Sequence, residues 1–320
     1  MTDRERTAHL AVARVLAHCG GDPAAALGQV AAAVAAAPGA AEPYEVLGRL
    51  WAEQRAALAP LLARAGSLST VLAHAYVRYL EGDPDGAVLA LGSVAGARPA
   101  VAWAAAPWFA DPRVVAEVDA EALAEAALRI GDGGHPLDAP ESAEALAPWV
   151  AAVEAVAARP PGPEALARFA LFLRMCGRAE RSLELCDRAD AVRPVMLTAV
   201  VRAGSRRVLG DLDGAAAAFE QALLLDPANW SLHLDLADLC ASRADFAAAV
   251  AHAARGLSHA PDELLLRAAH AAYRTALTGD AGAFRHLLEL AGELEPGPYR
   301  DGLLEYARSA DGLPEELRAG

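Results

Sequence analysis

Alanine-rich apolar segments alternate with short polar breaks along the chain. Most breaks carry a glycine, replaced once by alanine and usually followed by aspartate, and a proline stands 17 positions later. Glycine favours the left-handed cap that ends a helix, aspartate caps the next helix, and proline stops it. The pattern therefore predicts helical hairpins. The six pairs are Gly21/Pro38, Gly82/Pro99, Gly177/Pro194, Gly210/Pro227, Ala244/Pro261 and Gly279/Pro296.

The hairpins repeat at a nearly constant interval. Pro194, Pro227 and Pro261 are 33 and 34 residues apart, and Pro296 follows after 35. With each proline counted as position 32, small residues recur where two helices must approach closely. Position 8 holds Ala75, Ala170, Ala203, Ala237 and Ala272, with Arg14 departing; position 20 holds Ala26, Ala87, Ser182, Ala215 and Ala249, with Phe284 departing.

This pattern resembles the tetratricopeptide repeat (TPR), a helix–turn–helix unit of 34 residues. The best single match runs from Gly210 through Phe219 and Ala222 to Asp226-Pro227, and a degenerate seventh unit begins near Ala41. The resemblance implies an all-α fold, a right-handed superhelix of TPR-type hairpins (an α-solenoid). Residues 100–162 do not fit the repeat and are expected to be diverged repeats or a helical insert, with helices near 120–130 and 142–158.

Four parts of the chain follow from this interpretation. They are N-terminal TPR-like repeats (1–99), the diverged helical insert or degenerate repeats (100–162), C-terminal TPR repeats (163–297), and a capping helix with the tail (298–320). Solenoids need such a cap to cover the last apolar face.

Composition excludes several kinds of function. Alanine accounts for 83 of 320 residues, and lysine is absent, so all 28 basic residues are arginine. Without lysine there is no P-loop lysine, no kinase lysine and no Schiff base. The net charge of −14 argues against nucleic-acid partners and against a polybasic membrane anchor. The uncharged helix expected between Pro23 and Pro38 is too short to span a bilayer, which predicts a cytoplasmic protein without membrane contact.

No catalytic, cofactor or metal motif is found in the sequence. GxSxG, HExxH, GxGxxG and the P-loop are all missing, and the four scattered cysteines form no CxxC. His252 and His259 could share a helix face, but two histidines without a third ligand make a weak metal site. We therefore expect neither an enzyme nor a cofactor.

Arginines reverse the charge locally. Residues 168–207 hold nine arginines and four acidic residues. In the TPR family, positions 2, 5, 9 and 12 of the first helix line the concave groove. That resemblance places Arg174, Arg207 and Tyr79 at position 12, and Tyr76, Asp238 and Tyr273 at position 9. Internal ion pairs and core packing are the alternatives for these side chains. The family's carboxylate clamp uses lysine and asparagine, so it does not transfer to this chain.

The leading hypothesis is an interaction scaffold or adaptor that binds a peptide or protein segment in the concave groove. Arginine suits carboxylates, so an acidic segment is the expected chemistry. The alternative is a sensor of a peptide or small anionic ligand, and an enzyme built on the solenoid ranks last.

Overall fold

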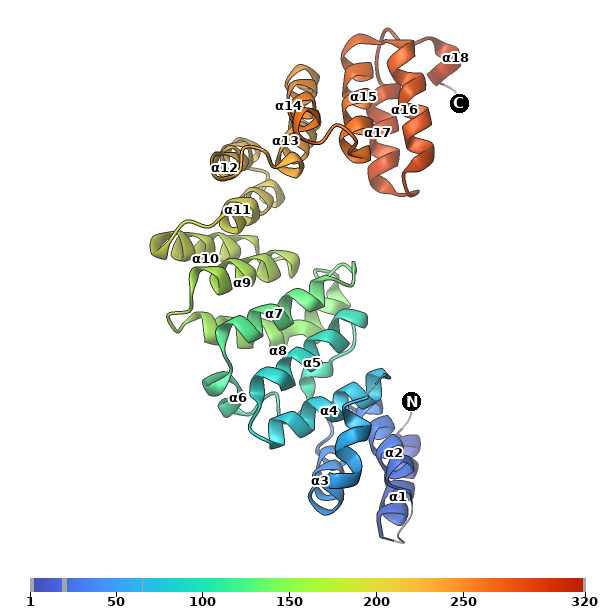
Figure 1. The fold of residues 1–320 in the computed structure, drawn as a ribbon, viewed down its shortest axis with the longest axis vertical. Helices are drawn as coiled ribbons and strands as arrows, with labels where there is room; N and C mark the ends of the chain where they lie inside the picture. Colours follow the sequence, from blue (N-terminus) through green and yellow to red (C-terminus); the bar gives the residue numbers. More distant parts are fainter. Residues whose placement is uncertain (1–2, 19–21, 65, 319–320) are drawn as a thin grey trace. The chain divides into compact units, whose positions relative to one another are not determined.

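The computed structural model describes residues 3–18, 22–64 and 66–318. Over these residues the chain forms α-helices and one short 3₁₀-helix, η1, without any β-strand (Figure 1). The prediction of an all-α fold is confirmed. Contacts within the chain define two compact units, Met1–Val201 and Arg202–Gly320.

The first unit contains ten α-helices within the described ranges. They are α1 (Asp3–His18), α2 (Pro23–Ala36), α3 (Ala41–Leu62), α4 (Leu68–Leu80), α5 (Pro84–Ala97), α6 (Pro112–Glu117), α7 (Ala120–Gly131), α8 (Pro140–Ala157), α9 (Pro163–Met175) and α10 (Ala179–Val192), with η1 at Trp103–Ala105. Helix α11 (Met196–Val208) crosses the boundary, and its residues from Arg202 on belong to the second unit. The second unit continues with α12 (Leu212–Leu225), α13 (Trp230–Ser242), α14 (Phe246–His259), α15 (Leu264–Thr278), α16 (Ala281–Glu293), α17 (Pro298–Arg308) and α18 (Glu315–Arg318).

The turns between paired helices follow the predicted chemistry. Gly82, Gly177, Gly210 and Gly279 have φ values of 75°, 73°, 80° and 67°, and Ala244 adopts the same left-handed region at 58°. An aspartate after five of the predicted turns caps the next helix by accepting from a backbone amide, at Asp22, Asp83, Asp211, Asp245 and Asp280, whereas Arg178 follows Gly177 and makes no side-chain cap. The predicted turn glycine Gly21 lies outside the described residues.

The small residues predicted at the helix contacts are buried. Ala75, Ala170, Ala203, Ala237 and Ala272 have no exposed surface, and neither do Ala87, Ser182, Ala215 and Ala249. Helix pairs such as α4 with α5, α9 with α10 and α13 with α14 pack together in these hairpins. The repeat register read from the sequence is therefore correct.

Replacing Ala215 by leucine is expected to lower the free energy of unfolding by about 1–3 kcal/mol, because the larger side chain overpacks a buried contact. Urea unfolding followed by circular dichroism measures this. Ala217 lies on the exposed side of the same helix, so Ala217→Leu is the control and should leave the midpoint nearly unchanged. Equal midpoints for the two variants would contradict the assigned contact.

Residues 100–162 are helical and join the stack of the first unit. Helix α7 packs against both α5 and α9, while α8 packs beside α7, η1 and α9. Helices α7 and α8 confirm the two helices predicted near 120–130 and 142–158, whereas η1 and α6 were not predicted. A Cβ added to Gly92 of α5 would lie 2.6 Å from the carbonyl oxygen of Ala126, so α5 and α7 meet backbone to backbone.

Two further predicted segments are observed. Helix α3 contains the first helix of the degenerate repeat and departs from helical geometry at Gln54. At the other end of the chain, α17 packs against α15 and α16, which confirms the predicted helix after Pro298. The boundary between the two compact units falls inside α11 rather than at either end of residues 100–162. The four-part division of the chain stays a prediction.

Candidate functional site

Three of the predicted groove residues gather in the second unit. Arg207, Asp238 and Tyr273 come from α11, α13 and α15, the first helices of successive repeats. The Tyr273 hydroxyl donates a hydrogen bond of 2.5 Å to Oδ1 of Asp238. Arg207 is exposed, and its charge lowers the pKa of Asp238. The sequence register thus brings these three side chains to one region.

Helix α17 adds two tyrosines to Asp238 and Tyr273. The hydroxyl of Tyr299 donates to Oδ1 of Asp238 at 3.3 Å, and the ring of Tyr306 meets that of Tyr273 edge to face at 5.9 Å. We call these four residues the tyrosine–aspartate site. Sequence reasoning treated the two α17 tyrosines only as part of a cap. A usable signal existed, because Tyr306 follows Tyr273 by 33 residues, about one repeat.

Burial dominates the electrostatics of the tyrosine–aspartate site. Removal from water raises the pKa of the Asp238 carboxyl to about 6, and the neighbouring charge of Asp235 adds to this rise. The two tyrosine hydrogen bonds and Arg207 act in the opposite direction. Burial also raises the pKa of both tyrosines, so their hydroxyls stay protonated and donate to the carboxylate.

Two cavities adjoin the tyrosine–aspartate site. The first, of about 170 Å³, is lined by its four residues together with Pro298, Gly302 and Leu303. The second, of about 370 Å³, is lined by Leu265, Leu294, Glu295, Pro296, Gly297 and Arg300 and shares Pro298 and Tyr299 with the first. The two cavities are therefore neighbours, one around a carboxylate and one with a largely apolar wall.

Tyr76 and Tyr79 lie in the first unit within a series of aromatic contacts. Tyr76 stacks on Tyr79 at 6.3 Å, and Tyr79 meets Trp108 at 5.5 Å. The Tyr79 hydroxyl donates to Asp111 at 2.5 Å and accepts a hydrogen bond from Arg113. Both tyrosines are half-buried against the core of this unit. They combine packing with a partly exposed surface, and Tyr79 and Arg113 also line a cavity of about 190 Å³.

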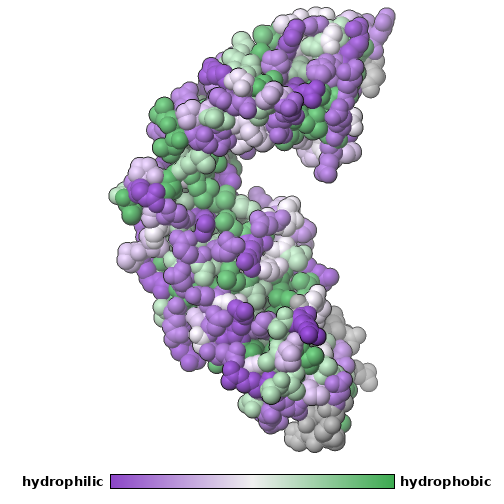
Figure 2. Space-filling view, in the orientation of Figure 1, coloured by the Kyte–Doolittle hydropathy of each residue, from purple (hydrophilic) through white to green (hydrophobic). Residues whose placement is uncertain are grey.

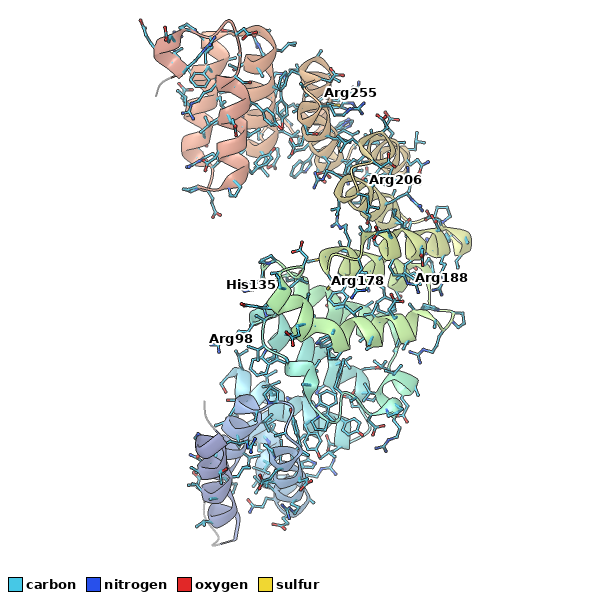
Figure 3. All side chains as sticks on the ribbon, turned by 180° about the vertical axis from the view of Figure 1, so that it is seen from behind. Arg98, His135, Arg178, Arg188, Arg206 and Arg255 are labelled. Carbon is cyan, nitrogen blue, oxygen red and sulfur yellow. The ribbon has the colours of Figure 1, made fainter. Side chains whose placement is uncertain are left out.

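Most arginines of residues 168–207 have partners inside the protein. Arg168 pairs with Glu121 at 2.9 Å, and Arg193 pairs with Glu164. Arg181 binds both Glu154 and Glu184. Arg188 on α10 donates to the carbonyl oxygen of Ala157 at 2.5 Å, and Arg206 pairs with Asp211 at 3.5 Å (Figure 3). These contacts favour internal pairing for much of the charge reversal.

The two predicted groove arginines are not alike. Arg174 is half-buried and already has an interaction within the chain. It belongs to the first unit, whereas Arg207 belongs to the second. That both arginines line the concave groove therefore stays a prediction.

A histidine cluster joins α13 to α14, and sequence reasoning missed one member. His233 lies 5.9 Å from His259 and 6.4 Å from His252, measured between ring centroids. Burial lowers the pKa of His233 and His252. Arg255 on the same helix as His252 and His259 (Figure 3) also lowers both values. Over residues 3–18, 22–64 and 66–318, no group of three histidine, cysteine or acidic side chains is arranged to hold a metal ion.

Comparison with known proteins agrees with the repeat pattern. Residues 209–273 match the sequence profile of the tetratricopeptide repeat. The chain therefore carries tetratricopeptide repeats over these residues, and we call it the TPR protein on this basis. No curated protein sequence matches it.

Solved structures include several similar helical-repeat chains. The APC/C hetero-tetramer Cut9–Hcn1 matches with 12% identity and a TM-score of 0.41, over 84% of this TPR protein and 46% of that chain. TTC0263, a TPR protein of Thermus thermophilus, matches with 23% identity and a TM-score of 0.39. The match covers 65% of this chain and 98% of the TTC0263 chain. The human IFIT1 dimer with PPP-AAAA matches with 17% identity and a TM-score of 0.47. The match covers 93% of this chain and 74% of the IFIT1 chain. This TPR protein therefore spans less than half of the Cut9–Hcn1 chain.

The surface of the TPR protein mixes polar and apolar residues on the face drawn in Figure 2. Apolar side chains are exposed on α12, where Leu224 is 82% exposed and Leu225 is 56% exposed. None of the helices in the described part of the chain has both the length and the apolar character needed to cross a bilayer.

Proposed function

We propose that this TPR protein is an interaction scaffold or adaptor whose second unit binds a peptide or protein segment along α11, α13 and α15. TPR proteins generally mediate protein–protein interactions. The observation that carries the proposal is the convergence of Arg207, Asp238 and Tyr273 from three successive first helices. A binding role, rather than catalysis, suits this combination of one exposed cation, one carboxylate and several tyrosines.

An acidic residue of the partner is proposed to face Arg207. The side chain is exposed, whereas Arg168, Arg181 and Arg193 already hold carboxylates of this chain. A guanidinium suits carboxylates because it presents a planar set of donors. Sensing of a small anionic ligand remains the second hypothesis from the sequence, and no contact in the described part of the chain favours it over protein binding.

Arg207→Ala is expected to weaken partner binding by about 1.5–3 kcal/mol if the contact is desolvated, because a charge-assisted hydrogen bond is lost. The partner is first isolated by affinity capture from the source cell and identified by mass spectrometry. Its affinity for the wild type and the variant is then measured at low and high salt. The wild type should lose more affinity with salt than the variant does.

Arg285→Ala is the matched control, because Arg285 is also exposed but lies on the second helix α16. It should bind the partner like the wild type, and the melting temperature of both variants should stay nearly unchanged. Equal affinity of the wild type, Arg207→Ala and Arg285→Ala would contradict an interaction face along the first helices.

A further inference from the structure

We propose that the tyrosine–aspartate site is an anchor for a basic side chain of the partner segment, with the neighbouring cavity receiving an adjacent apolar side chain. This inference rests on the proposed interaction function and specifies the chemistry that this region recognises. The proposed function places an acidic residue of the partner at Arg207, whereas this inference places a basic residue of the partner at Asp238.

The Asp238 carboxylate has one oxygen without a hydrogen-bond donor in the described part of the chain. Both tyrosine hydroxyls donate to Oδ1. In the described part of the chain, no donor is found for Oδ2 and no arginine forms an ion pair with this carboxylate. Burial costs this carboxylate solvation, which the two tyrosine hydrogen bonds at Oδ1 and the charge of Arg207 offset only in part, because the pKa of Asp238 stays raised. A guanidinium or ammonium group in the cavity would supply that counter-ion at Oδ2.

Three tyrosines form part of the cavity wall around Asp238. Tyr273 and Tyr306 meet edge to face, and Tyr299, which is 38% exposed, lines the same cavity and donates its hydroxyl to Asp238. Tyrosine rings attract cations through their faces, and arginine takes part in such contacts most often. A cavity of about 170 Å³ that combines one carboxylate with three tyrosines therefore suits an organic cation.

The neighbouring cavity lies directly beside the tyrosine–aspartate site. It shares Pro298 and Tyr299 with the first, and its wall includes Leu265, Leu294 and Pro296. A segment that places a basic side chain at Asp238 can therefore place the next apolar side chain there. Charge agrees with this occupant, because residues 202–320 contain 18 acidic residues and 11 arginines. A partner segment is favoured over a free amine because a free amine would leave the second cavity unfilled.

Binding should depend on pH because the cation needs an ionised Asp238. Burial raises the pKa of this carboxyl to about 6, so below that pH the carboxyl binds a proton in place of the cation. The two tyrosines that donate to this carboxyl do not change charge near that pH. Tyr273 and Tyr299 stay neutral because burial raises their pKa values. Two charged groups act on this carboxyl, Asp235, which raises its pKa, and Arg207, which lowers it.

The test uses the full chain and the probe acetyl-Arg-Leu-amide, with acetyl-citrulline-Leu-amide as its neutral isostere. The chain has six tyrosines, so ring signals of the ¹³C-tyrosine-labelled protein can be assigned by substitution. At pH 7.5 the arginine probe should shift the signals of Tyr273, Tyr299 and Tyr306 and bind about tenfold or more tightly than the citrulline probe. At pH 5 this preference should disappear.

Asp238→Asn should abolish the preference, because the asparagine side chain carries no charge. Asp262→Asn removes one exposed charge elsewhere in the second unit and should leave the preference intact. The inference is overturned if both probes bind equally to the wild type, if neither probe shifts these tyrosines, or if Asp238→Asn keeps the preference.

Two further probes separate this inference from the function on which it rests. Acetyl-Glu-Leu-amide shifting the same tyrosines would retain a peptide-binding face and overturn the cation anchor. Ethylguanidinium carries the cation but no apolar side chain for the second cavity. If it binds as tightly as acetyl-Arg-Leu-amide, the proposal that the partner segment fills both cavities is overturned. Loss of the interaction function itself would appear in the Arg207 experiment with the captured partner.

Discussion

Gly96→Ala is expected to lower the free energy of unfolding of the first unit by about 1–3 kcal/mol, because an added methyl group overpacks a backbone contact. A Cβ at this position of α5 would overlap the carbonyl oxygen of Arg129 and lie 3.3 Å from the Cα of Ile130, both in α7. Neither atom belongs to a flexible side chain, so the helices must separate. The loss opposes the usual stabilisation of a helix by alanine relative to glycine.

Gly28→Ala is the control for this prediction. Gly28 lies inside α2, is exposed, and has no neighbouring atom within 4 Å of an added Cβ. Alanine there should stabilise the protein by about 0.5–1 kcal/mol. Urea unfolding of the two variants should therefore shift in opposite directions. A stabilising effect of Gly96→Ala would show that α5 and α7 do not approach at this distance.

Gly279→Ala is expected to lower the free energy of unfolding of the second unit by about 2–5 kcal/mol, because backbone strain and overpacking add. Gly279 ends α15 with φ of 67°, in the left-handed region that side chains with a Cβ disfavour. Its added Cβ would also lie 2.6 Å from the Cα of Gly312, beyond the end of α17. The substitution therefore disturbs the contact between this turn and the segment after the capping helix.

Gly210→Ala isolates the strain from the overpacking. Gly210 has φ of 80° and no atom within 4 Å of an added Cβ. Its substitution should cost about 1–2 kcal/mol, the strain alone. The difference between the two variants in denaturant unfolding measures the close approach of Gly279 and Gly312. Equal losses would mean that these backbones are not in contact.

The helical hairpins were determined by the sequence itself. Glycine after the first helix, an aspartate cap and a terminal proline act on backbone atoms within a few residues, so local chemistry predicts them. Even the departure at Ala244 keeps the left-handed turn, because its neighbours Arg243 and Asp245 complete the same hydrogen-bonded geometry. The small residues also follow, since alanine or serine at positions 8 and 20 of most repeats marks a recurring helix contact.

The candidate site was predicted in part. Repeat register brought Arg207, Asp238 and Tyr273 to successive first helices, and the structure joins Asp238 to Tyr273 directly. The register did not include Tyr299, because α17 lies beyond the last complete repeat. Its hydroxyl reaches Asp238 across 61 residues, a distance in sequence over which local patterns carry no information.

Only the tertiary structure decided which surfaces meet. The acidic partners of Arg168 and Arg193 lie 47 and 29 residues away in sequence, and many carboxylates in the chain have suitable chemistry. Likewise, nothing in the sequence around Gly96 indicates that the backbone of α7 packs against this glycine. The physical reason is the range of the forces involved. Backbone conformation is set by adjacent residues, whereas ion pairs, backbone contacts and the ionisation of Asp238 depend on groups that only packing brings together.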